Sequence, residues 1–143
     1  MLKKFDELTL HELYAILQLR NEVFAVEQNC VYPDMDNKDQ PSFHLMGLEG
    51  DKLLAYARIF PPGITYKEPS IGRVVIAPAA RGGGAGRDLM KRSVEETNKL
   101  FGKLPVRISA QLYLHSFYSS LGFQQTGDVY LQDGIEHIEM ILH

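Results

Sequence analysis

The sequence of 143 residues contains a single cysteine, Cys30, so it cannot form an internal disulfide bond, and a reducing compartment is the simplest expectation. No apolar run reaches the roughly 18 residues of a membrane-spanning helix. Residues 1–7 lack the apolar core of a signal peptide. Basic residues are not in excess either: 15 Lys and Arg face 18 Asp and Glu, for a net charge of -3. We therefore expect a cytoplasmic protein whose partners are neither nucleic acids nor membranes.

The composition is that of a globular protein, with 45% hydrophobic and 23% charged residues, which excludes wholesale disorder. The length suits one domain, residues 1–143, and a chain of this size can bury a core without a metal or a disulfide. The five histidines show no metal-ligand spacing. Residues 34–39 resemble the start of a calcium loop but lack its glycine and its closing glutamate, so we expect no metal.

Apolar periodicity and turn residues predict the order of the elements. Thr9 and Glu12 form a capping box at the start of the first helix, and Gly122 is placed to end the last one. We expect strands over 2–5, 43–48, 53–60, 71–77, 105–110, 123–132 and 135–142, and helices over 10–25, 85–101 and 112–121. The strand–helix–strand stretch within 71–110 predicts a parallel pair and the hairpins predict antiparallel pairs, so the fold class is α/β with a mixed sheet (α+β).

The most informative segment is the run of glycines at 82–84 and 86, which follows a strand and opens a helix. Glycines let the backbone approach a ligand closely, and the free amides at a helix start attract an anion. Arg81 and Arg87 flank the run. The segment therefore predicts a phosphate or pyrophosphate site, the alternative being a merely flexible turn. Neither the P-loop pattern nor the dinucleotide-binding pattern fits it.

The pattern that does fit is R-x-x-G-x-G, as Arg81, Gly84 and Gly86, and it resembles motif A of the GNAT superfamily of N-acetyltransferases. About 30 residues later, residues 117–123 (FYSSLGF) resemble motif B of the same superfamily. Residues 19–36 and 133–137 resemble the ElaA-like branch of it. The resemblance spans the chain and implies the GNAT acyl-CoA N-acyltransferase fold: a central mixed, twisted sheet, splayed at the cofactor site and flanked by helices.

The resemblance also implies acetyl-CoA as co-substrate. In the superfamily the strand before the glycine loop parts from its parallel neighbour and pairs with pantetheine, and Gln111 stands where many members place an asparagine. The implied cofactor contacts are Val74, Val75, Ile76, Arg81, Gly82, Gly83, Gly84, Ala85, Gly86, Arg87, Gln111 and Phe117.

Direct acyl transfer needs a proton for the leaving thiolate and a base for the amine. Tyr118 stands where the superfamily usually has its general acid; the alternative is a core tyrosine satisfied by one hydrogen bond. The base candidates are Glu27, His44 and His137, or water. Arg58, Arg73 and Arg107 lie inside expected strands, where they either bind an acidic acceptor or pair internally with Glu49 or Asp128. We place Arg73, His44 and His137 at the acceptor site and Glu27 with Tyr118 in catalysis.

The sequence thus predicts an N-acetyltransferase that moves the acetyl group of acetyl-CoA to a small primary amine in a ternary complex. One hypothesis is that this amine also carries an acidic group. One alternative is a non-catalytic acyl-CoA-binding or regulatory module of the same fold, and another is an enzyme that uses a nucleotide. The sequence does not identify the acceptor amine. It also leaves the oligomeric state open, and a homodimer is one alternative.

Overall fold

All strands of the protein join into one mixed sheet, and the computed structural model describes residues 1–143. The order along the sheet is β1-β2-β3-β4-β5-β8-β6, with β7 also paired to β8. The strands are β1 (Leu2–Lys4), β2 (Phe43–Glu49), β3 (Lys52–Phe60), β4 (Ser70–Ile76), β5 (Val106–Gln111), β6 (Gln124–Gln125), β7 (Tyr130–Gln132) and β8 (Ile135–Leu142).

Three α-helices accompany the sheet: α1 (Leu10–Arg20), α2 (Ala85–Phe101) and α3 (His115–Ser120). Helix α1 continues directly into a π-helical segment, η2 (Asn21–Glu27), and short 3-10 turns precede or follow other elements: η1 (Phe5–Glu7), η3 (Pro78–Ala80) and η4 (Leu112–Leu114). None of these helices combines the length and the apolar character that a membrane span would require.

Most of the expected elements are present, and the local signals act as predicted. The Thr9 hydroxyl accepts from the Glu12 amide at 3.0 Å while the Glu12 carboxylate accepts from the Thr9 amide at 2.8 Å. The strand expected over 123–132 is wrong, because only Gln124–Gln125 and Tyr130–Gln132 pair with β8. Gly127, with φ 90°, turns the chain between the two short pieces.

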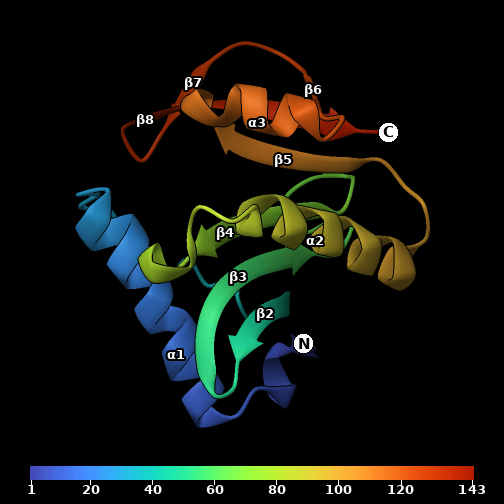
Figure 1. Ribbon diagram of the computed structural model, residues 1–143. Coiled ribbons are helices and arrows are strands. Elements are labelled where there is room, and N and C mark those ends of the chain that lie inside the picture. Colours follow the sequence, from blue (N-terminus) through green and yellow to red (C-terminus); the bar gives the residue numbers. More distant parts are fainter.

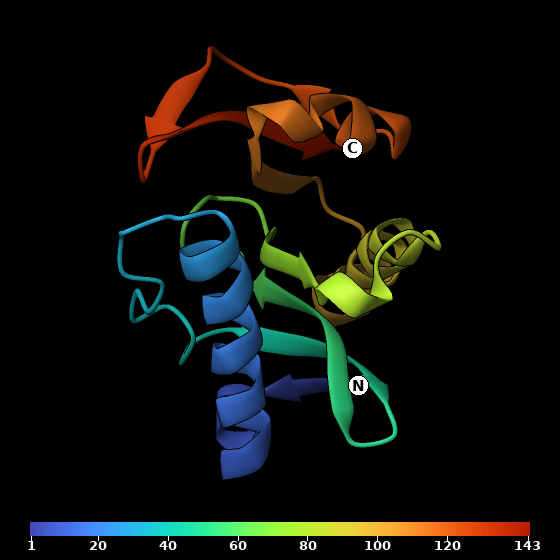
Figure 2. The same cartoon turned by 60° about the vertical axis from the view of Figure 1, so that its left-hand side comes forward.

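The helices cover opposite faces of the sheet (Figures 1 and 2). On one face, α2 and α3 pack on a core that includes Leu89, Met90 and Tyr118. On the other face, α1 and η2 pack through Ile16 and Val23 against β3 and β4. Figure 1 shows α3, β5 and β8 above β4 and α2, with the chain crossing between these layers at the end of α2.

The parallel pair β4–β5 is joined at one end only. Its sole residue pair is Ser70 with Arg107, although β4 continues to Ile76 and β5 to Gln111. The two strands therefore part towards their carboxyl ends, and the edge of each strand beyond that pair has no strand partner there. The expected parallel pair is confirmed, and so is its splaying.

A β-bulge at Arg73 changes which side chains of β4 face each helix layer. Arg73 has φ 48°, and residues 73 and 74 together oppose Ala57 of β3. Side chains of an unbroken strand alternate between faces. Because of the bulge, Ile71 and Val74 both face the α2 layer, whereas Val75 faces α1.

Candidate active site

The opening between β4 and β5 forms a groove of about 650 Å³. Its walls come from the end of η2, the inner strands β3, β4 and β5, the glycine loop before α2, and helix α3. The predicted residues that line it are Glu27, Arg73, Val74, Val75, Ile76, Arg81, Gly82, Gly84, Ala85, Gly86, Gln111, Phe117, Tyr118 and His137. Gly83, Arg87 and His44 do not line it.

The glycine loop presents a row of free backbone donors to this groove. None of the six amides from Gly82 to Arg87 donates to another group of the protein. Gly82 and Gly84 have φ of 95° and 81°, and Gly84 is the residue that precedes α2. Free amides at the positive end of a 17-residue helix form an anion site. The interpretation as a merely flexible turn does not account for this arrangement.

Arg81 is already engaged by a carboxylate. Its two terminal nitrogens each donate to Glu27 at 2.7 Å, and its Nε donates to the Ile76 carbonyl at 3.2 Å. The hydrogen bonds from Arg81 lower the pKa of Glu27. A general base needs the opposite shift, so the structure argues against the expected role of Glu27 as base. The arginine at the far side of the loop, Arg87, donates to the Ser120 hydroxyl at 2.8 Å.

Tyr118 is 7% exposed and packs edge-on against Phe117 and Phe123, with ring centroids 5.1 and 5.8 Å away. Its ring lies in the core, but its hydroxyl makes no hydrogen bond within the protein, unlike the satisfied core tyrosine considered as the alternative. Burial, with a smaller effect of Tyr113, raises the pKa of Tyr118 to about 12. The phenol is therefore neutral at physiological pH and available as a proton donor.

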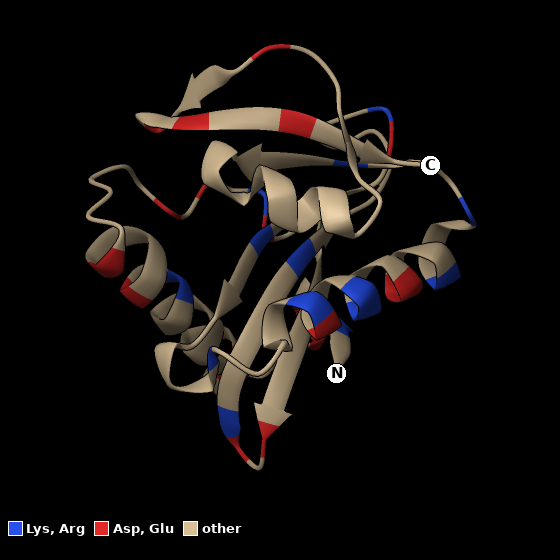
Figure 3. Cartoon of the chain, turned by 45° about the horizontal axis from the view of Figure 1, so that its top comes forward, with Lys and Arg blue, Asp and Glu red and all other residues tan.

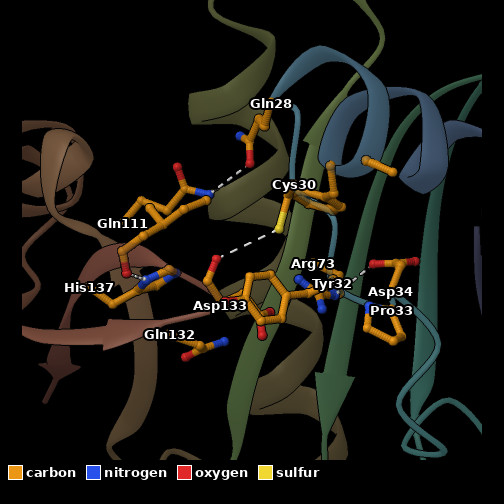
Figure 4. A pocket seen from close by; sticks show the side chains of 13 residues that line it. Gln28, Cys30, Tyr32, Pro33, Asp34, Arg73, Gln111, Gln132, Asp133 and His137 are labelled. Carbon is orange, nitrogen blue, oxygen red and sulfur yellow. Dashed lines mark hydrogen bonds and ion pairs between the residues drawn. The ribbon is translucent and has the colours of Figure 1, made fainter.

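A recess of about 30 Å³ adjoins the groove on its α1 side, and Figure 4 shows it from close by. His137 and Gln111, paired across β8 and β5, lie together on one wall, opposite Cys30 of the loop after η2. The Gln111 amide donates to the Gln28 side chain at 3.1 Å. The Nδ1 of His137 lies 2.7 Å from the Ile135 carbonyl oxygen.

A family model described as an acetyltransferase (GNAT) domain matches residues 12–143. The chain belongs to the GNAT acetyltransferase family. The ElaA protein of Escherichia coli K12 is 43% identical over 137 residues, which cover 94% of this chain and 90% of ElaA. The resemblance to the ElaA-like branch is thereby confirmed.

Solved structures agree. A crystal structure of an acyl-CoA N-acyltransferase from Pseudomonas aeruginosa superimposes with a TM-score of 0.95 at 43% identity, covering 100% of this chain and 97% of that one. The crystal structure of Escherichia coli ElaA gives a TM-score of 0.92 at 39% identity, covering 100% and 98%. Family and fold together support an acyl-CoA-dependent acyltransferase and confirm the expected GNAT fold.

In this GNAT protein His44 lines neither the groove nor the recess, which corrects its expected place in the site. It is 1% exposed, with Nε2 2.9 Å from the Asp39 carbonyl oxygen and Nδ1 2.6 Å from the Tyr56 hydroxyl. Burial lowers the pKa of His44. Both ring nitrogens are used inside the core, so His44 is a structural residue.

The mid-strand arginines each lie beside a carboxylate, and Figure 3 shows basic residues on the central strands. Arg58 donates two hydrogen bonds of 2.9 Å to Asp36 and one of 2.8 Å to Asp39. Arg73 lies 3.1 Å from Asp34. Arg73 forms no hydrogen bond in this ion pair. The internal pairing considered as the alternative is thus present with other partners than expected, and an acidic acceptor stays a prediction.

Arg20 belongs to the same network of ion pairs, and Arg107 forms a separate one. Arg20 is fully buried and pairs with Asp34 at 2.9 Å and Asp39 at 2.7 Å. Arg107 pairs with Glu68 at 3.0 Å and Glu139 at 3.3 Å. Arg58, Arg73 and Arg107, the arginines of the sheet, thus each have a carboxylate partner.

Sequence reasoning missed several residues of the site. Phe24 lies under the Arg73 guanidinium, 5.1 Å from it, and lines both the groove and the recess. Gln28 and Gln132 line both as well. A glutamine or phenylalanine carries no chemical signature of its own. The resemblance of residues 19–36 to the ElaA-like branch was a signal for Phe24 and Gln28, and nothing in the sequence marked Gln132.

Proposed function

We propose that this protein transfers the acetyl group of acetyl-CoA to a small primary amine by direct attack within a ternary complex. The observation that carries the proposal is the groove itself: free amides of the glycine loop lie at one part of it, and the unpartnered hydroxyl of Tyr118 lies at another. Acetyl-CoA is an extended molecule with a diphosphate and a thioester. The diphosphate needs hydrogen-bond donors such as the loop amides, and the thioester sulfur needs a proton donor such as Tyr118.

The glycine loop supplies the anchor. Six amides, from Gly82 to Arg87, would donate to the pyrophosphate oxygens, and the α2 dipole would favour the negative charge. Arg81 can add charge only by leaving Glu27. The anchor therefore rests mainly on backbone groups, which hold phosphate oxygens without committing a side chain.

The split sheet supplies the place for the thioester. Beyond Ser70 the edge of β4 that faces β5 lacks a strand partner, so backbone groups of residues 74–76 can pair with the pantetheine chain and stabilise the charge that develops on the carbonyl oxygen. Gln111 faces the same space from β5. Tyr118 then donates its phenolic proton to the thiolate as the carbon–sulfur bond breaks.

The acceptor follows from the charges around the recess. Because Arg58 and Arg73 are paired with aspartates, nothing in their arrangement favours an amine that carries an acidic group. We propose a primary amine that presents no carboxylate or phosphate. Arg73→Ala should change the KM of acidic and neutral amines alike, and a rise confined to acidic amines would contradict this choice of acceptor.

The test is a panel of primary amines mixed with acetyl-CoA, with release of free thiol as the readout. We expect turnover with at least one neutral amine and thermal stabilisation by CoA but not by NAD or ATP. Stabilisation by CoA without thiol release for any amine would favour the non-catalytic acyl-CoA-binding module. Stabilisation by ATP or NAD in place of CoA would overturn the assignment of the glycine loop.

A further inference from the structure

His137 and Tyr118 line the same groove from opposite faces of the sheet. Along β5 and β8 the side chains alternate, and Ala110 and Ile138 belong to the α2–α3 core together with Tyr118. Gln111 and His137, one position away on each strand and directly paired, must therefore face the α1 side. The recess on that side, where His137 lies beside Gln111, agrees with this placement (Figure 4).

The hydrogen bond to the Ile135 carbonyl fixes how the His137 ring is protonated. A carbonyl oxygen can only accept, so Nδ1 must carry the hydrogen across the 2.7 Å separation. In the neutral ring Nε2 is then the nitrogen with the free lone pair. The imidazole is 7% exposed, and no other protein group forms a hydrogen bond with Nε2.

The two carboxylates that line the groove, Glu27 and Asp36, are committed elsewhere. Glu27 accepts two hydrogen bonds from Arg81. Asp36 accepts two from Arg58. Both carboxylates face guanidinium groups, so their lone pairs are occupied by arginine N–H groups. The neighbouring positive charge also lowers their affinity for a proton, which a base needs.

From this placement we infer that His137 is the general base of the transfer reaction, with Nε2 taking the proton from the acceptor amine on the α1 side of the sheet. The inference rests on the proposed function. The amine nitrogen forms its bond to the carbonyl carbon and gives a proton to Nε2. The carbon–sulfur bond breaks and the sulfur takes the proton of Tyr118, after which the imidazolium and the phenolate exchange protons with water.

This division of labour matches the geometry of acyl transfer. The nucleophile must approach one face of the planar thioester carbonyl while charge collects on the oxygen and then on the sulfur. A base on one face of the sheet and an acid on the other put the two proton transfers on the two sides of the splayed strands.

The surroundings of His137 carry charges of both signs, and Asp133 is the one carboxylate among them without an ion pair. Its neighbours with titratable side chains are Tyr130 on β7, Glu139 on β8, Arg73 on β4, Asp133 in the β7–β8 turn, and Cys30, Tyr32 and Asp34 in the loop after η2. Arg73 is paired with Asp34 and Glu139 with Arg107, so those charges offset one another.

The decisive variant is His137→Asn, whose side-chain amide can still donate to the Ile135 carbonyl but offers no lone pair in place of Nε2. With acetyl-CoA and the fastest neutral amine of the panel, we expect kcat to fall by about 10²–10⁴-fold. The acidic limb of the pH profile of kcat should disappear, and the KM for acetyl-CoA should change by less than about threefold. His11→Asn, on the exposed face of α1, is the matched control.

A second acceptor separates a base from a merely structural residue. Methoxyamine is unprotonated at neutral pH and needs no base to become a nucleophile, so its loss of rate in His137→Asn should be much smaller than that of the alkylamine. Equal losses for both amines, or an unchanged pH profile, would overturn the assignment while leaving wild-type acetyl transfer intact. A wild-type protein that acetylates no amine would instead refute the proposed function, and the base with it.

Discussion

The carboxylate of Glu27 and the guanidinium of Arg81 meet through two hydrogen bonds of 2.7 Å, although the residues lie 54 positions apart. The pair joins the end of the π-helical segment to the start of the glycine loop. Glu27 was expected to act as the base and Arg81 to bind phosphate. In the structure each of these side chains is instead hydrogen-bonded to the other. The ion pair is partly solvent-exposed, since both side chains are 42% accessible.

Glu27→Gln should therefore leave catalysis largely intact and release Arg81 for phosphate. Because exposed ion pairs contribute about 0.2–1 kcal/mol, we expect CoA to bind up to about fivefold more tightly, with kcat within about threefold of wild type. Titration calorimetry with CoA measures the first effect and thiol release the second, with Glu22→Gln as the control. A hundredfold fall in kcat at unchanged CoA affinity would restore Glu27 as the base.

Gly84→Ala should weaken both the fold and the phosphate site. Gly84 has φ 81° at the start of α2, where a side chain costs about 1–2 kcal/mol of stability. Gly83 has no positive φ, and a methyl group added there would meet no atom within 4 Å, so Gly83→Ala is the matched control for stability. Urea unfolding and CoA titration check the two effects. Equal stability of the two variants would contradict the structural account.

Tyr118→Phe should separate activity from stability. The hydroxyl has no hydrogen-bond partner in the protein, so its loss should change the free energy of unfolding by less than about 0.5 kcal/mol. The loss of the proton donor should lower kcat by about 10²–10⁴-fold. Because the pKa of Tyr118 is raised to about 12, its ionisation should not limit kcat below about pH 10. Tyr14→Phe, on exposed α1, is the control, and a retained kcat would exclude Tyr118 as acid.

Acid should destabilise the protein through the aspartates that hold Arg20 and Arg58. Burial raises the pKa of Asp36 and Asp39, but the hydrogen bonds and charge of Arg58, joined by the charge of Arg20 at Asp39, outweigh it and leave both below their usual range, about 2 for Asp36. A carboxyl with a depressed folded pKa stabilises the fold fully above its unfolded pKa of about 3.9. That contribution is lost as the pH falls towards 2.

Asp39→Asn tests this account, because it removes one acid from the buried network. We expect a loss of about 3–5 kcal/mol at pH 7, where two arginines lose a charged partner, and a shallower fall in stability between pH 4 and pH 2 than in wild type. Urea unfolding at pH 7, 4 and 3 measures both. Asp51→Asn, in the exposed β2–β3 turn, should change neither quantity.

The fold was largely predictable because its local signals are strong. The Thr9 capping box, the glycine before α2 and the β-branched residues of β4 each act through their own neighbours. The two short strands after Phe123 look like one in the sequence, because Gly127 gives no warning that it turns the chain rather than continuing a strand. A π-helical continuation of α1 likewise has no signature in residue spacing.

The candidate site was predictable where glycines and a tyrosine mark it and unpredictable where distant side chains pair. Arg58 meets Asp36 across 22 positions, and Arg81 meets Glu27 across 54. Nothing in the spacing of charges along a chain selects such partners. The bulge at Arg73 is also invisible in sequence, since a positive φ at an arginine contradicts its own local preference and is imposed by the surrounding sheet.

Because Ser70 and Arg107 are the one residue pair between β4 and β5, the sheet has a gap between these strands. In the proposed reaction the extended pantetheine chain of the co-substrate would occupy that gap and form hydrogen bonds with the backbone edges of β4 and β5. It would take the place of a strand for as long as it is bound. The backbone amides of β4 and β5 that face the gap would then exchange with solvent more slowly in the loaded protein than in the empty one, whereas those bonded to β3 and β8 would change little. The two parts of the sheet on either side of the gap would thus be joined more firmly when the co-substrate is bound.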